Sequence, residues 1–597
     1  MPRSSPRLAA SWLAPHRLGM AACALIAAPL ACGTSSSTGT GGSAGTGATT
    51  AAGAGSGGAA GGSGSPAAGN SGVHGGSSGS ATTGGAGNGG TDSGRGGVEA
   101  GGAGTGGTQS AGMGGANGGS ASGRGGRAGS DGGMGASSGA GGTGGARPTV
   151  TAAMGTKLVK VNAGMKHQTF EGWGTSLCWW ANHVGGWDAD AQDAVVDAVV
   201  DPVKGLGYNV FRYNIGGGEN PSHDHMDQYR EMPGFEPSEG TWDFSADATQ
   251  RSVLGRIVER GTGVIVEAFS NSPPYWMTKS GCAAGSSDGS NNLKDDSYDA
   301  FADYLTEVVK HFRDEWGVTF RTLEPLNEPN ASWWKENNGQ EGCHFSPSNQ
   351  QTIIKAVAAS LTAKGLTDTT LSASDENSID DANTNLRTFD AESLAAMTQM
   401  NVHSYAGSKR KELRALATSK GKRLWQSESG PLNQTLDGDL DAAMFMAGRI
   451  IQDLRELEPE AWIDWQVGDP ARSWASFTLN DTQQKLTPLK RFYMHAGFSR
   501  FIRPGYTFVD IDDSDMVAAL SADGHALVVV ARNGDTSGSK GFTFDLTTLP
   551  TVAAAVEAHR TSSSEDLTDL PALEVAGYSF VATLPASSVT TFVVPMP

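Results

Sequence analysis

Two stretches of the chain, Thr322-Leu-Glu-Pro-Leu-Asn-Glu-Pro329 and Leu424-Trp-Gln-Ser-Glu-Ser-Gly430, share one pattern. Each begins as a strand-like apolar run and leads into a glutamate, Glu328 in the first stretch and Glu428 in the second. In a parallel β/α barrel the functional groups stand at the carboxyl ends of the strands. The fold therefore depends on whether the surrounding chain supplies the other strands and helices of such a barrel.

Strand-like and helix-like segments alternate from about residue 165 to residue 490. Apolar residues spaced three or four apart predict helices at Asp190–Val200, Tyr298–Trp316, Pro347–Lys364 and Leu440–Leu457. Short apolar runs predict eight strands: Gln168–Gly174, Asn209–Tyr213, Gly263–Phe269, Thr319–Leu326, Thr370–Ser374, Gln399–His403, Lys422–Gln426 and Ala461–Gln466. Eight strands separated by helices predict an α/β fold, a (β/α)8 TIM barrel over residues 167–490.

The pattern changes after about residue 505, where short β-type runs are broken by Gly, Asp and Ser. These runs are Thr507–Ile511, Met516–Leu520, Ala526–Ala531, Phe542–Phe544, Ala553–Ala558, Ser579–Thr583 and Thr590–Val594. The segment Lys157–Val161, before the barrel, is also strand-like. We therefore predict a β-sandwich side domain, formed by residues 148–166 together with residues 491–597.

The first 32 residues have the features of an export signal. Three arginines precede a short apolar run, Met20–Ala28, that is too short to span a bilayer. The run leads to Ala31-Cys32, which resembles a bacterial lipobox, although Pro29 stands where that pattern prefers Leu. Two alternatives follow: lipidation at Cys32, giving a surface lipoprotein, or plain secretion. Any membrane contact is expected only through this lipid.

Residues 33–147 are almost entirely Gly, Ser, Ala and Thr. Such a segment cannot bury enough apolar surface to offset its ordering entropy, so we predict a disordered linker. The whole chain has a formal net charge of −19. This acidity argues against nucleic acid or anionic lipid as a partner, and it serves solubility equally well. We expect a monomer.

Three cysteines, Cys178, Cys282 and Cys343, follow the linker. None has the spacing of a metal site. An exported protein can form disulfides, and Cys282 and Cys343 both lie in polar, Gly-rich stretches, so we predict that they pair. Cys178 lies in Ser176-Leu-Cys-Trp-Trp180 and is expected to be a buried free thiol.

In the predicted barrel Glu328 follows the fourth strand and Glu428 follows the seventh, and these strands face one another across the barrel mouth. Two carboxylates about 5–5.5 Å apart are typical of a retaining glycosidase, in which one acts as acid/base and the other as nucleophile. This chemistry needs no metal and no organic cofactor. A single glutamate would more simply be a solvated loop residue, but Asn327-Glu328-Pro329 together with a second strand-end glutamate favours the catalytic interpretation.

Motifs in family order along residues 157–597 resemble glycoside hydrolase family 30, within the large clan of (β/α)8 retaining glycosidases. They are Phe170-Glu-Gly-Trp-Gly-Thr175, Phe211-Arg-Tyr-Asn-Ile-Gly-Gly217, Asn271-Ser-Pro-Pro-Tyr-Trp-Met277, Phe498-Ser-Arg-Phe-Ile-Arg-Pro-Gly505 and Leu584-Pro-Ala-Ser-Ser-Val-Thr-Thr591. Gly172–Ala181 and Trp425–Ser429 resemble the endo-β-1,6-galactanase branch, except that Cys178 stands where a small residue such as Ala is expected. The resemblance implies galactan side chains of arabinogalactan as the polysaccharide substrate.

The resemblance also implies roles for the site residues. Glu328 would protonate the leaving oxygen and then activate water, while Glu428 would attack the anomeric carbon. Asn327 would bind the sugar 2-hydroxyl beside the nucleophile. Three further residues would orient or polarise Glu428: His403, Tyr405 and Arg212. For Arg212 a structural ion pair is an equal alternative, and for His403 a structural role is nearly so.

Tryptophans at or just past strand ends are candidates for stacking on the apolar face of a sugar: Trp180, Trp276, Trp333 and Trp465. Core packing is the alternative for each, and it is the expectation for Trp242, Trp316 and Trp425. Other possible functions are a family 30 xylanase or β-1,6-glucanase, and, from a different class, a catalytically inactive surface glycan-binding protein.

Overall fold

The computed structural model describes residues 147–222, 225–431, 436 and 438–597. The predicted export signal (1–32), the lipidation site Cys32 and all but the last residue of the predicted linker (33–147) lie outside these residues. Within the described residues, no helix combines the length and the apolar character needed to cross a bilayer.

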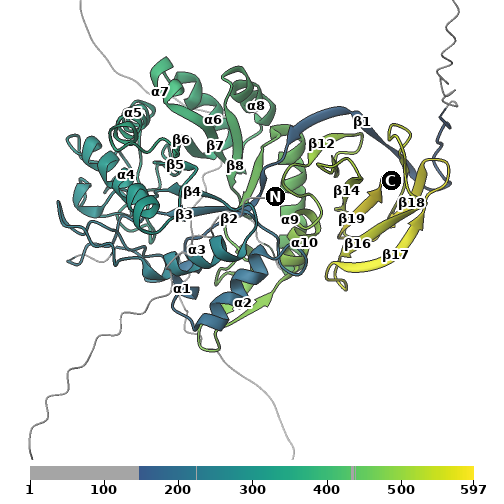
Figure 1. Ribbon diagram of the computed structural model, residues 1–597, viewed down its shortest axis with the longest axis horizontal. Coiled ribbons are helices and arrows are strands. Elements are labelled where there is room, and N and C mark those ends of the chain that lie inside the picture. Colours follow the sequence, from purple (N-terminus) through teal and green to yellow (C-terminus); the bar gives the residue numbers. More distant parts are fainter. Residues whose placement is uncertain (1–146, 223–224, 432–435, 437) are drawn as a thin grey trace, which may run out of the picture. The chain divides into compact units, whose positions relative to one another are not determined.

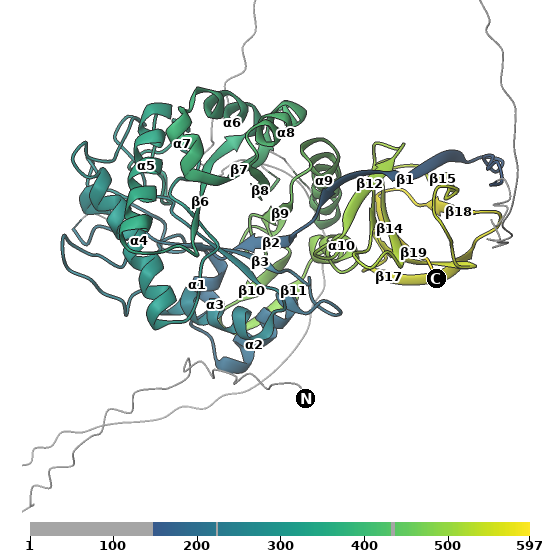
Figure 2. The ribbon, with the colours of Figure 1, turned by 45° about the horizontal axis from the view of Figure 1, so that its top comes forward.

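Eight parallel strands close into a barrel, and each corresponds to one predicted strand (Figure 2). They are β2 (Gly172–Ser176), β3 (Val210–Asn214), β4 (Ile265–Phe269), β5 (Thr322–Glu324), β6 (Thr370–Ser378), β7 (Met397–Ala406), β8 (Arg423–Glu428) and β9 (Ala461–Asp464). The ring closes where β2 pairs with β9, with Gly172 opposite Ala461. A closed ring leaves no free strand edge, and it brings all eight carboxyl ends to one mouth.

Helices surround this barrel, as Figure 2 shows. Their bounds are α1 (Trp180–Val184), α2 (Ala189–Val200), α3 (Ala248–Arg260), α4 (Tyr298–Glu315), α5 (Pro347–Ala363), α6 (Ile379–Asn385), α7 (Ala391–Ala396), α8 (Arg410–Ser419), α9 (Asp439–Gln452) and α10 (Lys490–Ser499). Helix α4 illustrates why they form, because Phe301, Leu305, Val308 and Phe312 recur at three- and four-residue spacing and are all buried. A hairpin of β10 (Phe477–Asn480) and β11 (Lys485–Pro488) follows the last barrel strand.

The side domain is a β-sandwich built from both ends of the catalytic region. Its strands are β1 (Lys157–Thr169), β12 (Thr507–Ile511), β13 (Met516–Leu520), β14 (Ala526–Asn533), β15 (Lys540–Asp545), β16 (Ala555–Thr561), β17 (Thr568–Glu574), β18 (Ser579–Leu584) and β19 (Ser588–Pro595). Strand β1, the long band in Figure 1, pairs in parallel with β15 through its first residues and antiparallel with β12 through its later ones. It thus belongs to both layers. Phe544 and Phe580 of one layer pack on Phe592 of the other.

Strand β17 has no counterpart among the predicted strands. It lies at the end of the nine-strand order, most of its residues are exposed, and it contains Pro571. Polar residues and proline are typical of an edge strand, and they also remove the alternation by which a strand is recognised in sequence.

The predicted disulfide between Cys282 and Cys343 is wrong, because among the described residues both are free cysteines. Each buried thiol contacts a different backbone carbonyl: Cys282 Sγ lies 3.6 Å from Glu336 O, and Cys343 Sγ lies 3.7 Å from His344 O. Backbone bridges join these loops instead, for example Asn291 to His344. The prediction for Cys178 is confirmed, since it is free and buried.

Candidate active site

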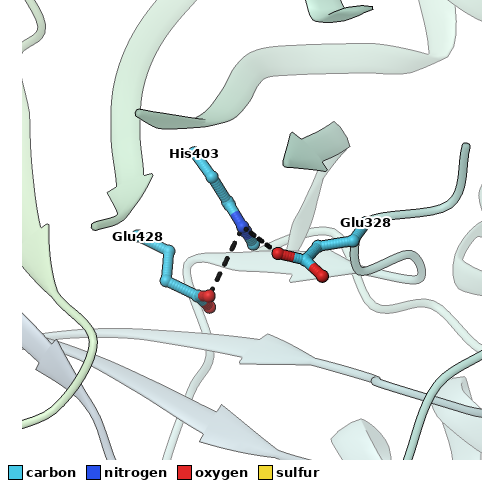
Figure 3. A group of neighbouring side chains, drawn as sticks. All are labelled: Glu328, His403 and Glu428. Carbon is cyan, nitrogen blue, oxygen red and sulfur yellow. Dashed lines mark hydrogen bonds and ion pairs between the residues drawn. The ribbon is translucent and has the colours of Figure 1, made fainter. Parts of the chain in front are cut away.

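Glu328 and Glu428 meet at the barrel mouth (Figure 3). Glu428 is the last residue of β8, and Glu328 follows β5 by four residues. One carboxylate oxygen of each, together with one ring nitrogen of His403, lie within 4.8 Å of one another. Both glutamates are more than nine-tenths buried. This separation matches the short spacing of retaining glycosidases and not the about 6.5–9.5 Å that inverting enzymes need for a water molecule.

The backbone of Glu328 has a left-handed conformation, with φ of +46°, which is unusual for a residue other than glycine. Two hydrogen bonds fix it: the Glu328 amide donates to Asp375 O at 2.9 Å, and Trp334 Nε1 donates to Glu328 O at 3.0 Å. Strained backbone of this kind persists only where the surroundings hold it.

The His403 ring lies between the two glutamates, as the dashed lines of Figure 3 mark. Its Nδ1 is 3.2 Å from Glu328 Oε1 and 3.4 Å from Glu428 Oε1. Its Nε2 is 3.2 Å from Asp375 Oδ2. His403 thus contacts both carboxylates, whereas the sequence had associated it with Glu428 alone.

Arg212 and Tyr405 both contact Glu428. Arg212 Nη1 donates to Glu428 Oε2 at 3.2 Å, and the Tyr405 hydroxyl donates to Glu428 Oε1 at 2.9 Å. Arg212 is fully buried, and it also forms ion pairs with Asp375 and, at 3.1 Å, with Glu267. The structural ion pair and the contact with Glu428, posed as alternatives for Arg212, therefore coexist.

Burial and charge shift the pKa values of this cluster in opposite directions. Burial raises the pKa of Glu428 to about 7, against the opposing charges of His403 and Arg212. Burial would lower the pKa of His403, but the carboxylates of Glu428 and Asp375 outweigh it and raise that pKa to about 10. For Asp375 burial is in turn outweighed by Arg212 and His403, which hold its pKa at about 2.

Two asparagines complete the polar part of the site. Asn327 is buried, and its Oδ1 has no hydrogen-bond partner within the described residues. A buried acceptor without a partner is costly, and this one can accept a hydrogen bond from a ligand hydroxyl. Asn377 was not predicted, and its Nδ2 donates to Glu328 Oε1 at 2.5 Å.

An aromatic cluster lines the same mouth, and it corrects one predicted residue. Trp180 does not belong to it: the side chain is fully buried in the barrel core, packs on Phe477 and donates to Ser176 O. Its neighbour Trp179 takes the place, with its ring 5.2 Å from that of Trp465. The cluster comprises Trp179, Phe269, Tyr405 and Trp465, with Tyr229 and Trp474 packed against it.

The other two candidate tryptophans differ in exposure. Trp276 packs against the barrel core and donates to Glu236 O. Trp333 is 46% exposed and is the one aromatic residue among the large apolar side chains exposed in the described parts of the chain. It lies five residues after Glu328, with its ring 6.0 Å from that of Trp334.

Three residues were missed by sequence reasoning: Asp375 and Asn377, which contact Glu328, and Trp179, which shares the aromatic cluster with Tyr405. For Asp375 and Asn377 a signal existed, because they directly follow the predicted strand Thr370–Ser374 and strand ends line the mouth. For Trp179 no signal distinguished it from the adjacent Trp180.

One group of acidic and histidine side chains in the described residues is close enough together to hold a metal ion: Glu328, His403 and Glu428. Binding would need the unprotonated form of His403. The raised pKa of His403 opposes that form at neutral pH. The arrangement suits proton transfer and nucleophilic attack better.

A (β/α)8 barrel with two glutamates at short range at its mouth defines the class of retaining glycoside hydrolases. Comparison with known sequences agrees: the profile of O-glycosyl hydrolase family 30 matches residues 156–421. An endo-β-1,6-galactanase from Hypocrea rufa is 33% identical over 410 residues, which cover 65% of this chain and 82% of that protein. The chain therefore belongs to glycoside hydrolase family 30.

A second relative and a solved structure are also similar to this chain. An exo-β-1,6-galactobiohydrolase from Bifidobacterium longum is 28% identical over 408 residues, which are 50% of this chain and 26% of that protein. The catalytic domain of a family 30 xylanase from Talaromyces cellulolyticus shares the fold, with a TM-score of 0.59 at 21% identity. That comparison covers 74% of this chain and all of the xylanase domain.

Proposed function

We propose that this glycoside hydrolase is an endo-β-1,6-galactanase that acts on the galactan side chains of arabinogalactan. The observation that carries the choice of sugar is the 33% identity to the Hypocrea rufa endo-β-1,6-galactanase over most of that protein's length. The exo-acting relative from Bifidobacterium longum is named for the same linkage. The short spacing of the two glutamates supports the reaction type.

In the first step Glu428 attacks the anomeric carbon while Glu328 gives its proton to the departing glycosidic oxygen. A covalent glycosyl-enzyme forms on Glu428. In the second step Glu328, now ionised, takes a proton from water, and the resulting nucleophile releases the sugar with its original anomeric configuration. Both steps need the two carboxylates on opposite sides of one bond.

The residues around Glu328 and Glu428 have roles in this two-step reaction. Asn327 Oδ1, which has no hydrogen-bond partner in the described part of the chain, accepts a hydrogen bond from a sugar hydroxyl in this scheme. Tyr405 and Arg212 hold Glu428 through separate oxygens, so the carboxylate has a single orientation. Trp465 and Trp179 share one aromatic cluster with Tyr405, which contacts Glu428, so this cluster is the proposed apolar surface for the C–H face of a sugar.

The test is product analysis of the full chain on β-1,6-galactan, glucuronoxylan and β-1,6-glucan. Cleavage of the first polymer alone, with early appearance of products of mixed length, is the expected result. Release of galactobiose alone from the start would replace endo action by exo action. Cleavage of another polymer would retain the mechanism and reject the galactan.

The catalytic roles are tested by Glu428→Ala and Glu328→Ala in the same assay. Both are expected to lose turnover of the polymer. Azide is expected to restore turnover of Glu328→Ala on an activated aryl glycoside, because a small anion can attack the glycosyl-enzyme without a general base. Rescue of neither variant would contradict the assignment of acid/base and nucleophile.

The same variants separate an enzyme from a surface glycan-binding protein. For the enzyme, the unmutated chain turns the polymer over and Glu428→Gln binds it without turnover. Tight binding without turnover by the unmutated chain would instead identify a binding protein.

We further propose that the protein is exported and either anchored through Cys32 or secreted. The proposal rests on the arginine-rich start, the short apolar run and Ala31-Cys32. Mass spectrometry of the mature N-terminus distinguishes the two forms. A diacylglyceryl-modified Cys32 supports the anchor, a cleaved chain without lipid supports secretion, and an uncleaved N-terminus contradicts both.

A further inference from the structure

Asp375 is a fully buried carboxylate within β6. It contacts Glu328 directly, and its partners Arg212 and His403 contact Glu428. Its backbone has φ of +58°, the left-handed region that side chains other than glycine seldom adopt. Both conformational strain and burial of a charge are costly, so their coincidence at one residue calls for a compensating set of contacts.

The side chain of Asp375 has three partners. One oxygen accepts a hydrogen bond from Ser427 Oγ at 2.5 Å. The other is paired with the Arg212 guanidinium and lies 3.2 Å from His403 Nε2. The two basic partners, Arg212 and His403, are the same two that contact Glu428.

The main chain of Asp375 connects it to the other glutamate. Its carbonyl oxygen accepts the hydrogen bond from the Glu328 amide, at 2.9 Å. One residue therefore fixes the backbone of Glu328 directly, and it fixes the carboxylate of Glu428 through Arg212 and His403.

We propose that Asp375 is a positioning residue that holds His403 as an imidazolium shared between Glu328 and Glu428. The proposal rests on the catalytic roles given above for the two glutamates. In it, the Asp375 carboxylate forms an ion pair with the ring on its Nε2 side, and Nδ1, which then carries a proton, faces the two reacting carboxylates.

A histidine shared between the two glutamates is useful in the first step, because the negative charge moves from Glu428 to Glu328. Before attack Glu428 is negative and Glu328 carries a proton. Afterwards Glu428 is a neutral ester and Glu328 is negative, because its proton has left with the leaving group. Nδ1 lies 3.2 Å from Glu328 and 3.4 Å from Glu428, so one N–H can pair with the charge at either site without movement of the ring. No proton leaves His403 in the step.

The charge balance around His403 favours the imidazolium. The groups that face the ring or its partners come from five strands or strand ends: Glu328, Glu428, Asp375, Tyr405 and Arg212. Three are carboxylates, and they raise the pKa of His403 against the effect of burial, to about 10. Asp375, with its pKa of about 2, is ionised at neutral pH.

The test is Asp375→Asn in the full chain, with ¹⁵N-histidine NMR as a readout independent of substrate. The His403 signal is assigned by its loss in His403→Gln. In the unmutated protein His403 is expected to be charged at pH 7, and in Asp375→Asn it is expected to titrate at least one pH unit lower. An unchanged titration, or a neutral His403 in the unmutated protein, overturns the proposal. The charge of His403 in the unmutated protein can be measured even where Asp375→Asn fails to fold.

Kinetics on whichever polymer the enzyme cleaves provide the second readout. Asp375→Asn is expected to lower kcat by tenfold or more, to leave KM within about threefold, and to move the alkaline limb of kcat to lower pH. A loss of activity with an unmoved limb would show a merely structural role. Absence of all cleavage by the unmutated protein would reject the proposed function, while the NMR result would still decide the role of Asp375.

The matched control is Asp453→Asn. Asp453 is equally buried and pairs with Arg410 at 2.8 Å, but it contacts neither glutamate. Its neutralisation is expected to lower thermal stability without moving either the His403 titration or the alkaline limb. Equal shifts in both variants would attribute the effect to loss of any buried ion pair and would overturn the specific role of Asp375.

Discussion

The hydroxyl of Tyr405 donates a 2.9 Å hydrogen bond to Oε1 of Glu428, and both side chains are buried. A hydrogen bond to a charged group contributes about 1.5–3 kcal/mol. Tyr405→Phe removes the bond and keeps the ring, so we expect kcat to fall by about 10–100-fold with little change in melting temperature. Stopped-flow measurement of glycosyl-enzyme formation checks this. A normal rate of that step would mean that the hydroxyl does not assist Glu428.

The acid limb of the pH profile should lie unusually high for a glutamate nucleophile. Burial raises the pKa of Glu428 to about 7, and a protonated carboxyl cannot attack. We therefore expect kcat/KM to fall about tenfold per pH unit as the pH drops below about 7. The rate of inactivation by a mechanism-based fluoroglycoside, measured against pH, reports the same group. A limb close to the ordinary value of about 4.3 would show that His403 and Arg212 outweigh burial.

Trp333 is expected to contribute to polymer binding. It is exposed and lies on the loop that carries Glu328, the residue that protonates the leaving group. Loss of a stacked ring costs about 0.5–1.5 kcal/mol, so Trp333→Ala should raise KM for polymer about 2–10-fold with kcat unchanged. Trp333→Phe should retain most of the affinity. Val581→Ala, which removes an equally exposed apolar group on β18, is the matched control, and an equal effect there would contradict the prediction.

The free thiols predict insensitivity to reductant. Burial raises the pKa of both Cys282 and Cys343 to about 12, so little reactive thiolate is present at neutral pH. We expect the same melting temperature with and without dithiothreitol, and alkylation of both cysteines by iodoacetamide only after unfolding. Peptide mapping under non-reducing conditions gives the decisive readout, since a linked Cys282–Cys343 peptide would restore the pairing expected from the sequence.

Periodicity alone was enough to predict the barrel. All eight strands overlap a predicted run, because each barrel strand is buried on both faces and each helix on one. The first prediction, Gln168–Gly174, is the least exact, since its first two residues belong to β1 and only its last three to β2. The glutamate pair was predictable for the same reason: once the strands are numbered, their carboxyl ends are known to share one mouth. The type of a residue and its position in the strand–helix alternation are therefore enough to place the two glutamates at the mouth.

Local geometry was not predictable in the same way. Trp179 and Trp180 are adjacent and chemically identical, and the turn between β2 and α1 alone decides which ring lines the mouth and which enters the core. Strand β6 extends to Ser378, past the predicted end at Ser374, but Asp375 and Asn377 are polar and resemble loop residues in sequence. Whether Cys282 and Cys343 pair depends on the directions of two side chains from separate loops, which spacing does not encode.

The double pairing of β1 has a consequence for how the protein is made. Val161 pairs with Ile511, and Lys157 lies opposite Phe542, so the first strand of the described residues finds its partners only after the whole barrel has been synthesised. Until then the backbone N–H and C=O groups on both edges of this thirteen-residue strand have no partner strand. Unpaired strand edges of this kind let nascent chains pair with one another. A chain that stops short of β12 would leave that strand permanently unpaired, so loss of the C-terminal strands should produce aggregation before it produces an inactive barrel.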